Sequence, residues 1–298
     1  MAAFSASPTG SLPVMPSRIA LVTTVTMPVP DADELLLMPH LPEATLAAWD
    51  DPAVDWAAFD LAIIRSTWNY HDHLDEFLAW ATRTAHVTRL VNPVEIIEWN
   101  TDKRYLADLA AQGFATVPTT FLNPGEAPDD TAVVALDGHL VVKPSVGAGS
   151  NGAKLFNGDA AAASAHLAEL HAQGKTVMLQ PYLSGVDTDG ETALMYVGGQ
   201  FSHAARKAAI LSRDMSWSTG IYADEKVVAT EPTAAERALA DSIVATLPRL
   251  AYARVDLLPT ASGPVVLELE LTEPSLFLGL GDGAPERAAT AFRALLDQ

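Results

Sequence analysis

A glycine-rich loop is the first stretch of this sequence whose residue types and spacing could do chemistry. Residues 147–152 read GAGSNG, which fits G-x-G-x-x-G, a weak signal for phosphate binding when it stands alone. A dinucleotide-binding loop or a P-loop would open a helix, but only Ala153–Phe156 follow before the turn pair Asn157-Gly158. The sequence therefore predicts strand, glycine loop, strand: a hairpin whose backbone N–H groups could close over phosphate oxygens.

Two lysines could supply positive charge beside this loop. Lys143 lies in the apolar run HLVVKP directly before it. Burying an ammonium group without a partner is costly, so an anionic ligand there would satisfy Lys143. Lys103 lies in the first turn of a helix predicted over 100–113, and two lysines can flank a polyphosphate as mobile charges. An exposed hairpin and a solvated helix lysine are the alternatives.

Three carboxylates near the end of the chain could bind a cation. Asp256 lies within the apolar run RVDLL, and Glu268 and Glu270 lie within VVLELEL. Residues i and i+2 of a strand point to one face, so the two glutamates lie about 7 Å apart on the same side. If the two strands pair, Asp256 joins them, and three converging carboxylates suit Mg²⁺. The alternative is an exposed sheet edge on which Arg254 forms a surface ion pair.

Composition limits the class of partner. The chain has 298 residues, 49% hydrophobic and 18% charged, an ordinary globular balance, with a formal net charge of −19. This charge argues against binding to nucleic acid or to an anionic membrane, but not against small anionic ligands. There is no cysteine for a disulfide or a thiolate metal site. Without a signal-like start or an apolar run of membrane-spanning length, we expect a soluble cytoplasmic protein.

The elements that must position these residues follow from apolar periodicity and turn signals. Residues 18–92 alternate strands (18–25 and 59–68) with a helix (73–85), which is typical of a small parallel α/β unit. Strands are predicted at 117–122, 139–144, 176–183, 254–258 and 264–271, a hairpin at 191–207, and helices at 100–113 and 160–170, from Thr233, and from near Pro285. We expect a flexible extension (1–17) and domains at 18–99, 100–183 and 184–298.

The ordered set of motifs resembles the ATP-grasp superfamily of carboxylate-amine ligases, closest to its glutathione-synthetase-like branch. The motifs are a helical lysine, V-V-K-P with a glycine hairpin, Q-P-Y-L, R-x-D and E-x-E, and they span about 95–280. The resemblance implies a mixed α/β and α+β fold. An N-terminal parallel α/β domain would precede a central lid lobe (100–183) and a C-terminal lobe with the metal site (184–298), and the two lobes would clasp ATP.

The resemblance also implies roles for individual residues. ATP would contact Lys103, Lys143, Ser145, Gly147, Gly149, Ser150 and Gly152 through its phosphates, Gln180, Tyr182 and Leu183 through adenine, and Glu191 near the ribose. Mg²⁺ would be held by Asp256, Glu268 and Glu270, and the transferred phosphoryl group steadied by Arg254, Arg206 and Lys207. The superfamily commonly has E-x-N where this chain has E-x-E, which leaves the number of metal ions open.

A narrower resemblance concerns the substrate. The segments AWDDPAVDWAAFDLAIIRSTWNYHDHLDEFLAW, WNTDKRYL and LELELTEPSLFL are similar to an actinobacterial subgroup that includes the D-cycloserine-forming cyclo-ligase of antibiotic biosynthesis. This implies an amino-acid-like carboxylate substrate, O-ureido-D-serine, which would be phosphorylated and closed into a ring by its own ureido nitrogen. Candidate substrate contacts are Arg65, Ser66, Thr67, Trp68, Tyr70, Glu273 and Ser275.

Three other functions remain open at this point: an intermolecular ligase of the glutathione-synthetase type, a dinucleotide-dependent oxidoreductase, and a non-catalytic nucleotide-binding protein. Homo-oligomer formation is open as well.

Overall fold

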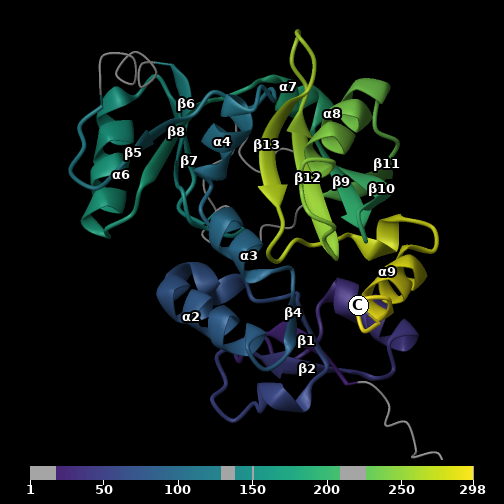
Figure 1. The fold of residues 1–298 in the computed structure, drawn as a ribbon. Coiled ribbons are helices and arrows are strands. Elements are labelled where there is room, and N and C mark those ends of the chain that lie inside the picture. Colours follow the sequence, from purple (N-terminus) through teal and green to yellow (C-terminus); the bar gives the residue numbers. More distant parts are fainter. Residues whose placement is uncertain (1–17, 129–137, 150, 209–225, 298) are drawn as a thin grey trace, which may run out of the picture.

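The described part of the molecule contains three β-sheets, and helices pack against them. The computed structural model describes residues 18–128, 138–149, 151–208 and 226–297. Its sheets have the strand orders β2-β1-β3-β4, β5-β8-β6-β7 and β11-β10-β9-β12-β13. In Figure 1 the first sheet lies below the other two, which stand side by side with α4 between them and α3 at the junction. The predicted extension (1–17) and Ser150 lie outside the described residues.

The N-terminal sheet is wholly parallel and is covered on both faces. Its strands are β1 (Ile19–Thr23), β2 (Ala44–Ala48), β3 (Leu61–Ile64) and β4 (Arg89–Val91). Alternate side chains of β1 and β3 pack against α2 (Leu74–Ala85) and α3 (Val94–Asn100), and the others against α1 (Ala32–Leu37) and α9 (Ala284–Arg293). Both faces of β1 and β3 are buried, which explains why their sequences are continuously apolar.

The second sheet carries the predicted glycine hairpin. Its antiparallel strands are β5 (Thr120–Leu122), β6 (His139–Pro144), β7 (Lys154–Asn157) and β8 (Val177–Pro181), and α6 (Ala160–Ala172) packs against it. β6 pairs with β7 from His139–Asn157 to Val142–Lys154, so the glycine loop joins two antiparallel strands. The strand, loop, strand prediction is confirmed.

The third sheet is antiparallel and carries the late carboxylates. Its strands are β9 (Glu191–Val197), β10 (Gln200–Lys207), β11 (Val227–Thr230), β12 (Tyr252–Leu258) and β13 (Val265–Glu270). The predicted hairpin turns at Gly198 and Gly199, whose φ angles of 58° and 79° favour glycine. α8 (Ala234–Val244) begins with the predicted capping box of Thr233 and Glu236.

The predicted helix at 100–113 is wrong in its first turn. α3 ends at Asn100, and α4 (Tyr105–Ala111) begins only after a turn that contains Lys103. The Asn100 side chain accepts from Leu271 N (2.7 Å) and donates to Leu269 O (2.6 Å) of the β13 segment, while Lys103 N donates to Ser145 O (2.8 Å). These long-range bonds hold the chain in a turn where local propensity favours a helix.

Short elements complete the described part of the chain. They are α7 (Gly185–Asp189) and the 3₁₀ helices η1 (Met38–His40), η2 (Trp56–Ala58), η3 (Trp68–Asp72) and η4 (Leu278–Leu280). Within the described ranges, no helix has the length and apolar character needed to cross a membrane. The three sheets fall within 19–91, 120–181 and 191–270, and the domain limits at 99 and 183 stay predictions.

Candidate active site

Pairing of β12 with β13 gathers the late carboxylates on one face. Asp256 lies opposite Glu268, and Arg254 lies opposite Glu270. Directly opposed residues of an antiparallel pair point to the same face, as do residues two apart along one strand. The sequence prediction that these carboxylates share a face therefore agrees with the observed strand register.

Lys143 brings the second sheet to this face. Its Nζ donates to Glu268 Oε1 at 3.0 Å, and the two side chains are 12% and 21% exposed. Burial acts to raise the pKa of Glu268, but the ammonium groups of Lys103 and Lys143 outweigh it and lower the pKa to about 2. Glu268 is therefore charged at neutral pH. Residues 125 positions apart in the chain meet in this ion pair.

Lys103 lies against the glycine loop. Its Nζ donates to Gly147 O at 2.7 Å. The loop has tight backbone requirements, since Gly152 has a φ of +75° and a Cβ there would lie 3.1 Å from Cδ of Pro144. Ser145 is buried, and its N–H donates to Thr176 O at 2.9 Å. The two lysines, the loop and Glu268 thus form one connected group, as the phosphate-site hypothesis requires.

Asp256 is held by two cations. It is 1% exposed, and Arg254 donates to it through Nε (2.9 Å to Oδ1) and Nη2 (2.8 Å to Oδ2), while Lys207 Nζ lies 2.9 Å from Oδ2. Burial opposes ionisation, but these cations keep the pKa of Asp256 well below its usual range. Lys207 also pairs with Glu191, whose pKa is raised to about 8 by burial and by the charge of Asp256, against the attraction of Lys207.

Two further glutamates titrate near neutrality. Burial raises the pKa of Glu270 to about 7; its ion pair with Arg254 opposes the shift, and the charges of Asp256 and Glu268 add to it. Burial also raises the pKa of Glu273 to about 8, with Glu270 adding and Lys103 opposing. A cation placed among these groups would favour their charged forms, which is the expected behaviour of a metal site.

The carboxylates do not form a ready-made coordination sphere. In the part of the chain that the structure describes, no group of three or more Asp, Glu or His residues is arranged to hold a metal ion. Arg254, Lys207 and Lys143 are bound to the carboxylates instead. The donor set still consists of the hard oxygen ligands that Mg²⁺ prefers, so the residue types fit this ion. Their role as metal ligands stays a prediction.

Arg206 does not join this group. Neighbouring residues of a strand point to opposite faces, and while Lys207 binds Asp256, Arg206 Nη1 donates to Asp189 O at 2.7 Å. The period of two along β10 was the signal that could have separated them.

The residues expected at adenine lie in the last part of β8 and directly after it. Gln180 is buried, and its Nε2 donates to Thr119 Oγ1 at 2.9 Å. Tyr182 N donates to His139 O at 2.7 Å, and Leu183 O accepts from Val186 N at 3.1 Å. The Tyr182 N–H is therefore used within the protein, and contacts of these residues with a purine stay predictions.

The predicted substrate residues of the N-terminal domain meet the segment after β13. β3 ends at Ile64, earlier than the predicted strand at 59–68, and Arg65 Nη2 donates to Pro274 O at 2.8 Å. Trp68 Nε1 donates to Glu273 O at 3.3 Å, and the Tyr70 hydroxyl bonds the Glu273 carboxyl. This contact between elements far apart in sequence places the two groups of candidates together.

The other predicted substrate residues have these positions. Ser66 Oγ donates to Glu34 Oε1 at 2.6 Å, Thr67 is fully buried, and Ser275 O accepts from Arg254 Nη1 at 3.0 Å. Their contact with a substrate stays a prediction.

Sequence reasoning missed several residues that shape the site. The Tyr105 hydroxyl accepts from Leu269 N at 3.0 Å, and Asn92 donates to Leu271 O at 2.6 Å. Asp33 accepts three backbone N–H groups of the segment that follows β13. No local pattern signals these roles. Asp33, for example, lies in a first helical turn, where the helix dipole already explains an acidic residue.

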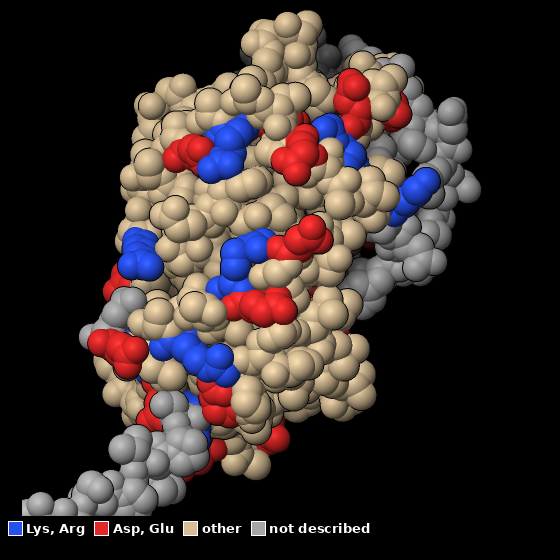
Figure 2. Space-filling view, turned by 90° about the vertical axis from the view of Figure 1, so that its right-hand side faces the viewer, with Lys and Arg blue, Asp and Glu red and all other residues tan. Residues whose placement is uncertain are grey.

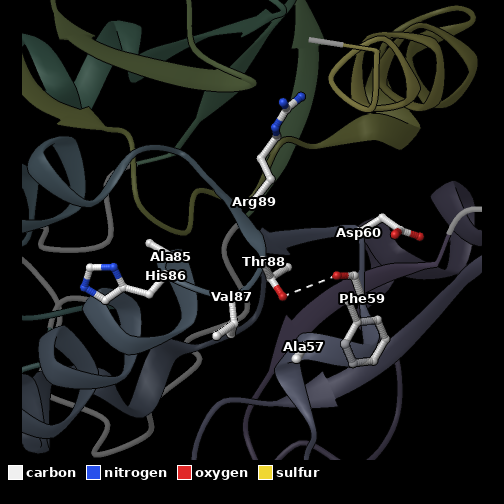
Figure 3. A pocket seen from close by; sticks show the side chains of 8 residues that line it. All are labelled: Ala57, Phe59, Asp60, Ala85, His86, Val87, Thr88 and Arg89. Carbon is white, nitrogen blue, oxygen red and sulfur yellow. Dashed lines mark hydrogen bonds between the residues drawn. The ribbon is translucent and has the colours of Figure 1, made fainter.

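A surface hollow lies elsewhere on the molecule. It is lined by Ala57, Phe59, Asp60 and residues 85–89, beside β4 (Figure 3). Thr88 Oγ1 donates to Phe59 O at 3.3 Å across its floor. The hollow includes none of the predicted site residues, so it is separate from the candidate active site.

Solved structures of other proteins share the fold of this chain. A RimK domain ATP-grasp protein from Sphaerobacter thermophilus superposes with a TM-score of 0.67 at 19% identity, covering 93% of this chain and 100% of that one. D-alanine–D-alanine ligase from Bacillus anthracis complexed with ATP superposes with a TM-score of 0.64 at 15% identity, covering 95% and 99%. The three-sheet fold is that of the ATP-grasp ligases.

Closer relatives define the family. The crystal structure of D-cycloserine synthetase DcsG superposes with a TM-score of 0.82 at 34% identity, covering 94% of this chain and 100% of that one. Residues 19–92 match the family model of the N-terminal domain of D-cycloserine synthetase DcsG. The cycloserine biosynthesis protein DcsG of Streptomyces lavendulae is 39% identical, over 92% of this chain and 97% of that protein. The chain belongs to the D-cycloserine synthetase DcsG family.

Proposed function

We propose that this chain is an ATP- and Mg²⁺-dependent cyclo-ligase that converts O-ureido-D-serine into D-cycloserine in antibiotic biosynthesis. The observation that carries the proposal is the Lys143–Glu268 contact, which joins the glycine-loop sheet to the carboxylate sheet in a chain of the DcsG family. Such a contact links a phosphate-binding group to a metal-binding group at one place, as phosphoryl transfer from a metal-bound nucleotide requires.

ATP would lie between the second and third sheets. Lys103, Lys143 and the loop from Ser145 to Gly152 would contact the phosphates, and Gln180, Tyr182, Leu183 and Glu191 the adenosine. Solved ATP-grasp structures that share the fold include a D-alanine–D-alanine ligase complexed with ATP and the ligase PsnB complexed with Mg and ADP, which supports both ligands here. Mg²⁺ would be held by Asp256, Glu268 and Glu270 and, when bound, would offset phosphoryl charge.

The chemistry requires activation of a carboxylate, which is a poor electrophile. Transfer of the γ-phosphoryl group to it gives an acyl phosphate and ADP. The substituted ureido nitrogen then attacks the carbonyl carbon, loses its proton, and expels phosphate as the ring closes. The ring nitrogen of D-cycloserine carries no carbamoyl group, so one water must also remove that group as carbamic acid, which decomposes to ammonia and carbon dioxide.

Individual residues of the chain have defined tasks in this scheme. Arg254 and Lys207, which hold Asp256, supply positive charge where the phosphoryl group is transferred, and fixed charges of this kind stabilise a transition state without reorganisation. Arg65, Ser66, Thr67, Trp68, Tyr70, Glu273 and Ser275 would bind the amino acid. Closure of the glycine loop would keep water from the acyl phosphate.

The glycine loop argues against the dinucleotide-dependent alternative. It joins β6 to β7 and does not open a helix, so it lacks the helix N-terminus on which a dinucleotide pyrophosphate rests. On the face in Figure 2, basic and acidic side chains are interspersed without a broad basic patch, in keeping with a small-molecule substrate. The absence of nucleic-acid and membrane partners and a cytoplasmic location stay predictions, and the oligomeric state stays open.

Product mass tests the proposal. The protein is incubated with ATP, Mg²⁺ and O-ureido-D-serine, and separately with pairs of amino acids, and ADP and product masses are followed. The proposal predicts ADP release with O-ureido-D-serine alone and a product with the mass of D-cycloserine. ADP release that requires a second amine, with a product that contains both molecules, would establish intermolecular ligation instead.

A further inference from the structure

The segment Thr272–Leu278, here called the strap, is held by side chains at successive residues. It links β13 to η4 and has no helical or strand structure before Leu278. Five consecutive carbonyl oxygens each lie within hydrogen-bond distance of a different side-chain donor, and the Tyr252 hydroxyl also lies 2.9 Å from Ile64 O. The bonds are Tyr252 Oη to Thr272 O (2.9 Å), Trp68 Nε1 to Glu273 O (3.3 Å), Arg65 Nη2 to Pro274 O (2.8 Å), Arg254 Nη1 to Ser275 O (3.0 Å) and His203 Nε2 to Leu276 O (2.9 Å).

Asp33 binds the backbone N–H groups of the same segment. Its carboxylate accepts from Leu276 N at 2.6 Å, Phe277 N at 3.1 Å and Leu278 N at 2.7 Å. Asp33 is 5% exposed and lies in the first turn of α1, so it reaches the strap from the N-terminal domain. Hydrogen bonds to an ionised carboxylate are stronger than neutral ones, and this one carboxylate accepts three of them from the strap.

The strap has a backbone conformation that needs such anchoring. Phe277 has a φ of +48°, which is uncommon for a bulky side chain. A residue in this region persists only where its surroundings over-determine it. The Asp33 carboxylate binds the amides on both sides of Phe277 and that of Phe277 itself, and it therefore fixes this turn.

The strap connects Asp33 to the candidate active site. It carries Glu273, whose carboxyl group accepts a hydrogen bond from the Tyr70 hydroxyl. The charge of Glu270 raises the pKa of this group and that of Lys103 lowers it. It also carries Ser275, bonded through its carbonyl to the same Arg254 that binds Asp256. A displacement of the strap would move Glu273 while the glycine loop, on another sheet, keeps its place.

We propose that Asp33 is a positioning residue, which sets the position of Glu273 for the carboxylic acid substrate by holding the strap. The proposal rests on the function proposed above. It adds that Asp33 affects binding of the acid and does not affect binding of the nucleotide.

The test compares Asp33→Asn with Asp31→Ala. Asparagine keeps the shape but removes the charge that three amides share. We expect kcat/KM for the acid to fall at least about tenfold through a raised KM, with nucleotide affinity within twofold of wild type, and faster hydrogen exchange at the amides of 276–278. Asp31 caps the same helix by accepting from Glu34 N at 2.7 Å without bonding the strap. Its alanine variant should lower Tm and leave the KM for the acid unchanged.

A second pair keeps the proposal testable if Asp33→Asn does not fold. His203→Gln retains an N–H that can donate to Leu276 O, while His203→Ala does not, so the glutamine variant should recover part of the lost kcat/KM. Wild-type kinetics in Asp33→Asn, or equal losses for acid and nucleotide, would overturn the proposal. If the wild-type protein releases no ADP with any acid, the proposed function itself has failed.

Discussion

Replacing Lys143 by methionine should separate catalysis from folding. Methionine keeps most of the apolar volume of the lysine stem and removes the ammonium group that lies 3.0 Å from Glu268. If the site binds a nucleotide as proposed, this change removes a fixed positive charge from the transferred phosphoryl group. Loss of one preorganised charge or donor costs about 10²- to 10³-fold in rate, and we expect a loss of this size in kcat/KM.

The structure also gives the accompanying change in stability. Against burial, Lys103 and Lys143 lower the pKa of Glu268 from 4.5 to about 2, which corresponds to about 3 kcal/mol of interaction. Two cations share this effect, so removal of Lys143 should lower the free energy of unfolding by about 1–2 kcal/mol at pH 7. The protein should remain folded with a modestly reduced Tm.

Steady-state ADP release and urea unfolding measure the two effects. Lys154→Met is the matched control, because Lys154 lies on β7 of the same hairpin, is 38% exposed, and pairs only loosely with Glu169 at 3.7 Å. The control should behave as wild type in both assays. A Lys143→Met enzyme whose kcat/KM stays within threefold of wild type would refute the assignment of this lysine.

Three further predictions concern the loop and the carboxylates. Gly152→Ala should lower the free energy of unfolding by about 1–2 kcal/mol and raise the KM for ATP, because φ at this position is +75° and a Cβ would crowd Pro144. Gly147→Ala should be tolerated, because the nearest atom to its Cβ lies at 3.5 Å. Thermal unfolding and ATP kinetics distinguish the two variants. Burial raises the pKa of Glu270 to about 7, so the folded state binds its proton more tightly than the unfolded state, and stability falls as pH rises from about 4.5 through about 7. In Glu270→Gln, Tm measured in EDTA should fall less steeply between pH 5 and pH 8 than in the wild type. An unchanged dependence of Tm on pH would contradict this prediction. Arg254→Met leaves Asp256 buried beside a single cation and should lower the free energy of unfolding by about 3 kcal/mol in urea titrations; a loss below 1 kcal/mol would contradict this reading.

Much of the fold was predictable because local signals agree with it. Apolar alternation and turn residues located the glycine hairpin, the hairpin at Gly198-Gly199 and the strands β12 and β13, whose pairing the structure adds. The period of two put Glu268 and Glu270 on one face, and the observed register adds Asp256. These features depend on residues close in sequence, where spacing alone defines geometry.

Other features depend on distant partners and were therefore not predictable. The turn at Lys103 exists because neighbouring backbone and side chains bond to the Ser145 and β13 segments, which no local pattern reports. Asp33 reads as an ordinary charge in a first helical turn, although its carboxylate binds amides more than 240 positions away. A single sequence shows which residues can do chemistry, but not which remote backbone groups hold them in place.

Transfer of an oxygen isotope tests the central claim most directly. O-ureido-D-serine labelled with ¹⁸O in both carboxylate oxygens is turned over with ATP and Mg²⁺, and the released phosphate is analysed by mass spectrometry. Formation of an acyl phosphate and its attack by nitrogen leave one substrate oxygen on phosphorus, so each phosphate should carry one ¹⁸O atom. Phosphate without label, released together with ADP and D-cycloserine, would show that the carboxylate is not activated by phosphorylation.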